Sequence, residues 1–202
     1  MKILKKTMAH NNTEIEIKIP LEQEQFETIQ KRLQQEATFL KTSEQKDTYL
    51  NPPHKNFLES EYPFEWLSIR QRAGKTILNY KHFHPEEAEE KTHCDEYETE
   101  IQKTEHLEKT FTALGFTEIV SVKKHRETYL YKDAFEIALD TVQEAGYFIE
   151  IEALKDFGSV EQTRIELFAL AQQLHLDIDT TEHRGYPQIL MQKKGLLKKD
   201  LS

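Results

Sequence analysis

Strict alternation of charged and apolar residues limits the folds open to this chain more than any other feature. In "TEIEIKIP" (13–20), Glu14, Glu16 and Lys18 alternate with isoleucines. Because successive side chains of a β-strand point to opposite faces, this period of two predicts a strand with one charged and one apolar face. The same logic predicts further strands at 44–51, 64–74, 75–83, 94–103, 117–132, 134–142 and 147–154.

Helical spacing of apolar residues predicts three helices, over 20–37, 104–116 and 160–176. Pro20 would begin the first helix, because proline is tolerated at a helix start, and Thr104 would be the N-cap of the second. A short terminal element follows at 186–194. The order strand, helix, four strands, helix, three strands, helix predicts an α+β fold with a mostly antiparallel sheet.

The charged faces of the predicted strands carry both signs of charge. At a single parity in each strand lie Arg70, Arg72, Lys81, Glu96, Glu98, Glu100, Lys124, Arg126, Glu136, Asp140, Glu150 and Glu152. Each face alone is typical of the solvent side of an antiparallel sheet. If the helices cover the apolar faces, however, the charged faces would line a closed barrel of about eight strands with helices packed outside. Such an interior is costly unless its groups pair or bind ions.

Composition narrows the classes of partner. The 202 residues fit a single domain, 1–202, in which 1–11 would be a flexible extension. A net charge of -9 disfavours binding to nucleic acid or to an anionic membrane. One cysteine and no long apolar run predict a cytoplasmic protein. Since no glycine-rich phosphate loop is present, any phosphate would be bound by side chains.

An ordered set of motifs resembles the CYTH superfamily, the triphosphate tunnel metalloenzymes. The motifs are "EIEIK", "DTYL", "SIRQR", "NYKHF", "DEYETEI", "VKKHRETY", "ALDTVQEAGYFIEIE" and "GYPQIL". The similarity covers about residues 12–192 and is closest to the class IV adenylyl cyclase and thiamine-triphosphatase-like types. One departure is the longer segment 51–66, which leaves the mouth of the implied tunnel open to question.

The resemblance implies a closed antiparallel barrel whose bore binds a triphosphate together with Mg²⁺ or Mn²⁺. It implies that the divalent metal is bound by Glu14, Glu16, Glu150 and Glu152. It also implies that the phosphates are bound, and the reaction catalysed, by Lys18, Arg70, Arg72, Lys81, Lys124 and Arg126. The supporting acidic residues Glu96, Glu98 and Asp140 would complete the acidic half of the site or position its cations.

Three functions remain open at this point. Metal-dependent hydrolysis of an inorganic or organic triphosphate asks least of the site and is slightly favoured. Class IV-type cyclisation of ATP to cyclic AMP and pyrophosphate would use the same charged residues. A non-catalytic polyphosphate-binding module is a third hypothesis, although anion binding alone needs no glutamates. We expect a small-molecule triphosphate as partner, with a homodimer as the assembly to test.

Overall fold

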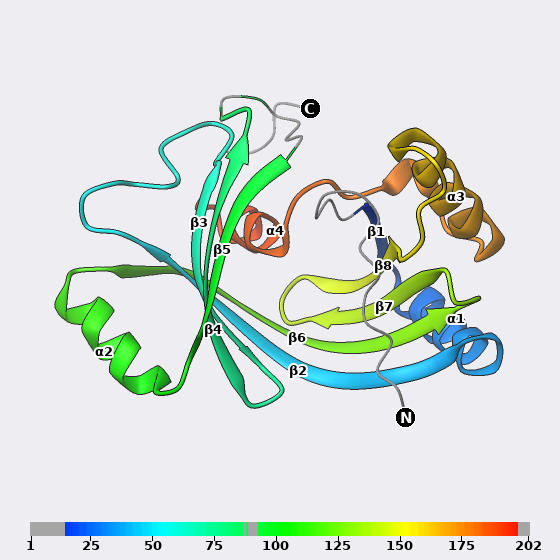
Figure 1. Cartoon of the computed structure of the whole chain (residues 1–202), viewed down its shortest axis with the longest axis horizontal. Coiled ribbons are helices and arrows are strands. Elements are labelled where there is room, and N and C mark those ends of the chain that lie inside the picture. The colour runs from blue at the N-terminus through cyan, green and yellow to red at the C-terminus, as the bar shows by residue number, and fades with distance from the viewer. Residues whose placement is uncertain (1–14, 87, 89–92, 198–202) are drawn as a thin grey trace. The chain divides into compact units, whose positions relative to one another are not determined.

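The computed structural model describes residues 15–86, 88 and 93–197 and has an α+β fold (Figure 1). Its elements are β1 (Glu16–Leu21), α1 (Gln23–Glu36), β2 (Thr38–Asn51), β3 (Glu65–Arg72), β4 (Lys75–His84), β5 (His93–Ile101), α2 (Thr104–Ala113), β6 (Thr117–Tyr131), β7 (Phe135–Val142), β8 (Gly146–Ala153), α3 (Val160–Gln173), the short 3-10 helix η1 (Ile178–Thr180) and α4 (Tyr186–Lys193). The predicted α+β class and order of strands and helices are confirmed.

The eight strands form one hydrogen-bonded sheet in the order β1-β8-β7-β6-β2-β3-β4-β5. The pairs β1–β8, β7–β8, β2–β3, β3–β4 and β4–β5 are antiparallel. Closure of this sheet into a barrel stays a prediction.

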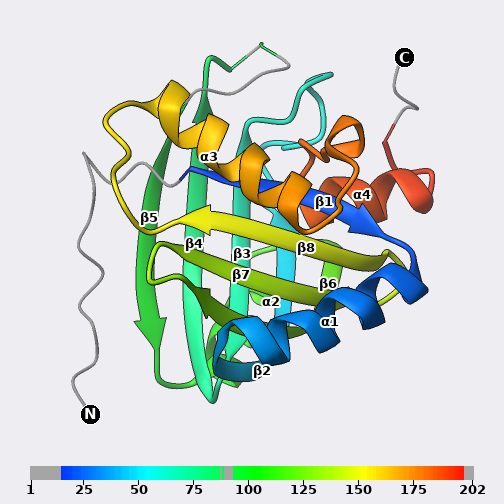
Figure 2. The ribbon, with the colours of Figure 1, turned by 90° about the vertical axis from the view of Figure 1, so that its right-hand side faces the viewer.

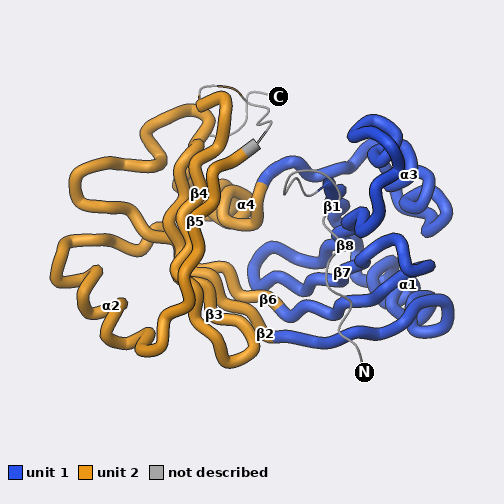
Figure 3. The backbone as a smooth tube through the Cα atoms, in the orientation of Figure 1, with its two compact units in different colours: residues 1–43, 125–184 blue, residues 44–124, 185–202 orange. Residues whose placement is uncertain are grey.

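The chain divides into two compact units, which Figure 3 distinguishes by colour. Unit 1 comprises the described residues of 1–43 and 125–184, and unit 2 comprises those of 44–124 and 185–202. The long strands β2 and β6 contribute to both units. The expectation of a single domain stays a prediction, and the proposed extension at 1–11 lies outside the described residues.

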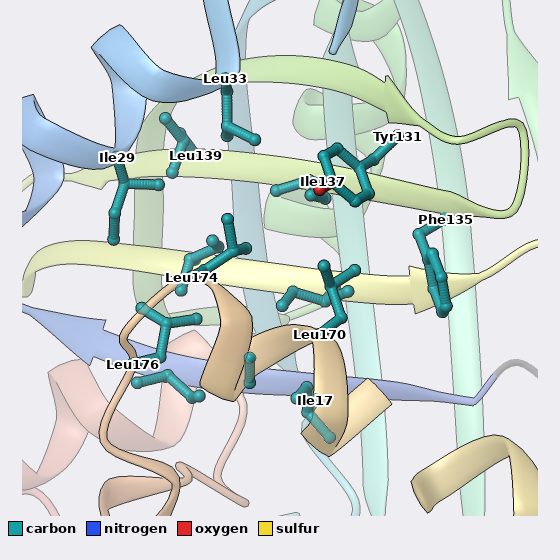
Figure 4. Close-up of a cluster of buried hydrophobic side chains, with 14 of the residues drawn as sticks. Ile17, Ile29, Leu33, Tyr131, Phe135, Ile137, Leu139, Leu170, Leu174 and Leu176 are labelled. Atoms are coloured by element: carbon teal, nitrogen blue, oxygen red, sulfur yellow. The ribbon is translucent and has the colours of Figure 1, made fainter. Parts of the chain in front are cut away.

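Unit 1 is built around an apolar core between its strands and two helices. Figure 2 shows α1 and α3 on the same face of β1, β7 and β8. Ile29 and Leu33 of α1 and Leu170 of α3 point toward the strands, where they meet buried residues such as Ile137 (Figure 4). Ser159 begins α3 by accepting a hydrogen bond from the Gln162 amide at 3.0 Å, which is an N-cap. The helices therefore cover the apolar face of the alternating strands, as predicted.

Unit 2 contains the β3–β4–β5 meander, α2 and α4. The tight β3–β4 turn places Ala73 and Gly74 at positive φ (49° and 80°), which explains the glycine at this turn. The segment 52–64 is anchored by Lys55, which pairs with the buried Glu65, and by the Phe57 ring, which lies 6.5 Å from that of Tyr80.

Three local expectations were wrong. Pro20 lies in β1 opposite Phe148, and α1 begins at Gln23 after the N-cap Glu22. Strand β1 is at the end of the sheet order, where a residue without an amide hydrogen is tolerated. Lys103, not Thr104, is the N-cap of α2. Finally, β2 begins at Thr38, six residues before the predicted strand.

None of the helices in the described part of the chain is long and apolar enough to cross a membrane.

Candidate functional site

The charged side chains of unit 1 lie on the face of the sheet opposite α1 and α3. Glu16 is directly opposite Glu152, and Lys18 is directly opposite Glu150, so all four share one face. Their neighbours Ile17 and Ile149 point the other way into the core. Alternation therefore separates an apolar face, covered by helices, from a face that displays carboxylates and an ammonium.

Arg126 is held on this face by two carboxylates. Its Nε and Nη2 donate to the two oxygens of Asp140 at 2.7 and 2.5 Å, and Nη2 also pairs with Glu150. The side chain of Asp140 is fully buried, whereas that of Arg126 is 18% exposed. A two-point pair of this kind fixes the plane of the guanidinium. Asp140 therefore holds a cation in this structure, and its predicted part in the site, whether it completes the acidic half or positions a cation, stays a prediction.

Glu16 is an acid with a strongly perturbed pKa on this face. Desolvation, with the nearby carboxylates of Glu150 and Glu152, raises its pKa to about 7, although Lys18 and Arg126 act in the opposite direction. Its side chain still reaches solvent. The pKa of Glu16 is raised by desolvation and by two neighbouring carboxylates, so a cation bound beside Glu16 would be favourable.

The segment 181–184, which follows η1, contacts Lys18 through two hydrogen bonds. The Lys18 ammonium donates to the carbonyl of Arg184 at 2.6 Å, and the Glu182 amide donates to the Lys18 carbonyl at 2.7 Å. Arg184 also donates from Nε and Nη2 to the Glu182 carboxylate at 2.8 and 2.6 Å. The segment 181–184, to which the sequence analysis gave no role, therefore fixes the Lys18 ammonium at a backbone carbonyl.

The cations of unit 2 gather on one face of β3, β4 and β5. Arg70 Nη1 lies 3.1 Å from Glu98 and 3.6 Å from Glu96, and Lys81 Nζ lies 3.2 Å from Glu96. Arg72 Nη2 donates to Asp47 at 2.8 Å. The predicted supporting residues Glu96 and Glu98 are thus paired with predicted phosphate-binding cations.

Several buried polar atoms on this face have no hydrogen-bond partner among the described residues. They are Asp47 Oδ1, Ser68 Oγ, Arg70 Nε and Arg72 Nε. Buried polar groups are nearly always hydrogen-bonded in folded proteins, so each unpartnered atom calls for an explanation. The two guanidinium nitrogens and the serine hydroxyl are donors, which a bound oxyanion would satisfy.

Aromatic side chains border the cations of unit 2. Burial and the Asp47 carboxylate raise the pKa of Tyr49 to about 12, so this phenol stays protonated. The buried Trp66 packs edge-on against Tyr49, with ring centroids 5.7 Å apart, which supports a space-filling role for Trp66. Lys124 is buried, with its Nζ 4.6 Å from the centroid of the Tyr186 ring in α4.

The structure brings the predicted residues together within each unit. In unit 1 these are Glu16, Lys18, Arg126, Asp140, Glu150 and Glu152, and in unit 2 they are Arg70, Arg72, Lys81, Glu96 and Glu98. Lys124 also belongs to unit 2, where it lies beside Tyr186. Glu14 lies outside the described residues. The roles of all these residues stay predictions. Sequence reasoning gave no role to Asp47, Tyr49, Ser68 and Asn79, although they share the parity of Arg70 and Lys81 in the strand register.

The acidic part of unit 1 fits a divalent metal only in part. No group of three or more candidate ligands converges among the residues that the structure describes. Mg²⁺, however, is often held by one or two carboxylates, with water and substrate phosphates as the other ligands. Glu16 and Glu152, on neighbouring strands, provide hard oxygen donors of this kind. The donor chemistry therefore suits Mg²⁺ or Mn²⁺ bound together with a phosphate.

Known proteins resemble this chain over most of its length. Over 177 residues the chain is 26% identical to the Methanocaldococcus jannaschii protein named "Putative adenylate cyclase MJ0240", covering 87% of this chain and 97% of that protein. The structure of the PH1819 protein of Pyrococcus horikoshii is 29% identical, with a TM-score of 0.70, and covers 90% of this chain and 99% of the other. A Vibrio parahaemolyticus structure described by the same words, "putative adenylate cyclase", is 26% identical, with a TM-score of 0.63 and coverage of 88% and 97%.

The sequence pattern of one protein family matches most of this chain. The CYTH domain pattern matches residues 12–186, which include all the charged strands described above. The chain therefore belongs to the CYTH domain family.

Proposed function

We propose that this protein is a metal-dependent enzyme that hydrolyses a triphosphate, either inorganic or organic. The observation that carries the proposal is the face of unit 2 on which Arg70 Nε, Arg72 Nε and Ser68 Oγ are buried without acceptors among the residues that the structure describes. A burial of donors without partners is unfavourable unless a ligand supplies the acceptors. A phosphate chain is rich in acceptor oxygens and carries the negative charge that guanidinium groups bind best.

Each type of cation has a distinct part in this proposal. The planar guanidinium groups of Arg70 and Arg72 would bind phosphate oxygens at two points. Arg126, whose Nε and Nη2 are held by Asp140 and Glu150, would contribute mainly its charge, and Lys18, Lys81 and Lys124 would act as point charges. Water attacks the terminal phosphorus, the bond from that phosphorus to the bridging oxygen breaks, and orthophosphate and the shortened phosphate leave. Because charge grows on phosphate oxygens during this step, fixed cations lower the barrier.

The carboxylates that would hold the metal are Glu16, Glu150 and Glu152, with Glu14 as a further candidate. When bound, Mg²⁺ or Mn²⁺ would neutralise phosphate charge and orient the phosphate chain. Asp140 acts on the basic side by keeping the Arg126 guanidinium in one plane. The closed barrel that the family resemblance implies is part of this proposal.

Cyclisation of ATP is the second candidate, and the relatives favour it. The M. jannaschii and V. parahaemolyticus proteins are both described as adenylate cyclases in the words quoted above. In that reaction a ribose 3′-hydroxyl attacks the α-phosphorus and pyrophosphate leaves. The same cations would serve both reactions, so the products rather than the charged residues distinguish them.

Product analysis tests the proposal directly. The purified full chain is incubated with tripolyphosphate, thiamine triphosphate or ATP, with Mg²⁺ or Mn²⁺, and orthophosphate, pyrophosphate and cyclic AMP are separated. We expect orthophosphate from at least one substrate. Cyclic AMP with pyrophosphate would instead establish the cyclase, and tight binding without any product would establish a binding module.

A pair of variants on β4 controls the product analysis. Lys81 is 26% exposed and pairs with Glu96, whereas Lys75 is 63% exposed and pairs with Glu100. Lys81→Ala should lower turnover at least about 10-fold because it removes a cation from the proposed site, whereas Lys75→Ala should not. Equal effects of the two substitutions would contradict the assignment of Lys81.

A further inference from the structure

A neutral, buried amide lies between the carboxylates and cations of unit 2. Asn79 is 1% exposed and is directly opposite Ser68 on β3 and Glu98 on β5. Its Nδ2 donates to Glu96 Oε1 at 2.7 Å and to Glu98 Oε1 at 3.0 Å. An amide nitrogen has two hydrogens, so both are used on two different carboxylates.

The same two carboxylate oxygens contact the cations. Glu96 Oε1 lies 3.2 Å from Lys81 Nζ, and Glu98 Oε1 lies 3.1 Å from Arg70 Nη1. Since one nitrogen is within 3.0 Å of both oxygens, the two carboxylates are held close together despite their like charge. The amide thereby holds Glu98 against Arg70 and holds Glu96 against Lys81, while Glu96 Oε1 also lies 3.6 Å from Arg70 Nη1.

We propose that Asn79 is a positioning residue, which acts through Glu96 and Glu98 to fix the directions of Lys81 and Arg70 toward a bound phosphate chain. This inference rests on the proposed function of those cations. The pKa of Glu96 agrees with it: burial raises this pKa, but Lys81, Asn79 and Arg70 outweigh burial and lower it overall. Glu96 therefore stays ionised and keeps its pairing.

Replacing the Asn79 amide by a carboxyl group tests the positioning role of Asn79, because it changes the charge of the side chain and hardly changes its size. Asn79→Asp places a third carboxyl group against Glu96 and Glu98. The ionisable groups on this face also include Asp47, Tyr49, Arg70, Arg72, Lys75, Lys81 and Glu100. Like charges at this distance raise the pKa of the new group. When protonated it can still donate one hydrogen bond, and when ionised it can donate none.

The measurement is the Kd for tripolyphosphate with Mg²⁺, by calorimetry on the full chain, at pH 5.5 and pH 8. At pH 8 the Kd of Asn79→Asp should be at least about 10 times the Kd of the parent protein. At pH 5.5 this ratio should be at least about three times smaller than at pH 8. Asn56→Asp is the matched control, because Asn56 is an exposed residue of the same unit and its Oδ1 acceptor is retained. Its ratio should stay near 1 at both pH values.

If Asn79→Asp fails to fold, a double variant that leaves the net charge unchanged still tests the inference. In the double variant Asn79→Asp, Glu98→Gln, the amide and the carboxylate trade places across β4 and β5 and the net charge is unchanged. This variant should fold and bind tripolyphosphate within about fivefold of the parent. A pH-independent ratio for the single variant, or no recovery in the exchange variant, would overturn the inference.

The outcome for Lys81→Ala separates this inference from the proposed function. If Lys81→Ala leaves the Kd unchanged, the proposed phosphate site fails. If Lys81→Ala weakens binding but Asn79→Asp binds as the parent does at both pH values, only the role of Asn79 fails.

Discussion

The carboxylate of Glu16 makes the stability of the protein depend on pH. Its pKa is about 7 in the folded protein, against an ordinary value of 4.5, so the folded state holds this proton more tightly than the unfolded chain does. The resulting stabilisation is fully present below about pH 4.5 and is lost as the pH rises through 7. In the absence of divalent metal, Glu16 thus makes the fold less stable at pH 8 than at pH 5.

Glu16→Gln should therefore flatten the pH dependence of the Tm between pH 5 and pH 8 in EDTA. Mg²⁺ should flatten it in the parent protein also, because a bound cation favours the ionised carboxylate. Glu36→Gln is the control, since Glu36 is an exposed partner of Arg32 on α1. An unchanged slope in Glu16→Gln would show that this carboxylate is not crowded in solution.

A substitution of Arg70 tests whether the binding of triphosphate depends on the geometry of the guanidinium group as well as on its charge. Arg70→Lys keeps the positive charge but loses the planar fork and its buried Nε donor, so we expect binding of tripolyphosphate to weaken by about 1–3 kcal/mol. Arg164→Lys on the exposed surface of α3 should change binding by less than about 0.5 kcal/mol. Titration calorimetry measures both, and equal affinities of parent and Arg70→Lys would place Arg70 outside the site.

Most of the charged side chains that the structure brings together could be identified from the sequence, although Asp47 was missed, whereas the neutral residues beside them could not. Alternation identifies charged residues that recur at one parity of a strand, such as Arg70 and Arg72 or Glu96 and Glu98. Asn79 and Ser68 share that parity but are uncharged and isolated, so their sequence neighbourhood gives no signal. Their burial follows from the strands on either side, which only the three-dimensional register reveals.

At the scale of elements, α3 is the clearest test of the core of unit 1. Leu167 is fully buried in this helix, and Ile165, two residues earlier, is 51% exposed. Leu167→Ala should lower the free energy of unfolding by about 2–5 kcal/mol, because it removes apolar contacts and leaves a cavity. Ile165→Ala should cost less than about 1 kcal/mol. Urea unfolding compares them, and equal losses would contradict the packing of α3.

The elements themselves were predictable wherever periodicity was strong. The hairpin strands β3 and β4 lie within about two residues of their predicted ranges, because alternation and Gly74 mark both strands and their turn. The start of β2 was missed because Thr38, Phe39 and Leu40 are all exposed and show no alternation of burial. Pro20 misled the prediction because a proline suits a helix start and an end strand equally well.

At the scale of the whole molecule, the CYTH domain family accounts for most of the chain, since the pattern matches residues 12–186. Both compact units carry cations to which a phosphate-binding role is proposed: Lys18 and Arg126 belong to unit 1, and Arg70 and Lys81 belong to unit 2. We expect Arg126→Ala and Lys81→Ala, made separately, each to weaken the binding of tripolyphosphate.

The thermal stability of the protein with tripolyphosphate and Mg²⁺ or Mn²⁺ tests this central claim most directly. A ligand that binds only the folded state stabilises it by about 2.7 kcal/mol at a hundredfold excess over Kd. For a chain of this size we expect the Tm to rise by roughly 5–10 °C. Sodium sulfate at matched ionic strength should not do this, and the double variant Lys81→Ala, Arg126→Ala should lose most of the shift. If tripolyphosphate with metal raises the Tm no more than sulfate does, the charged faces bind no triphosphate and the proposed function is wrong.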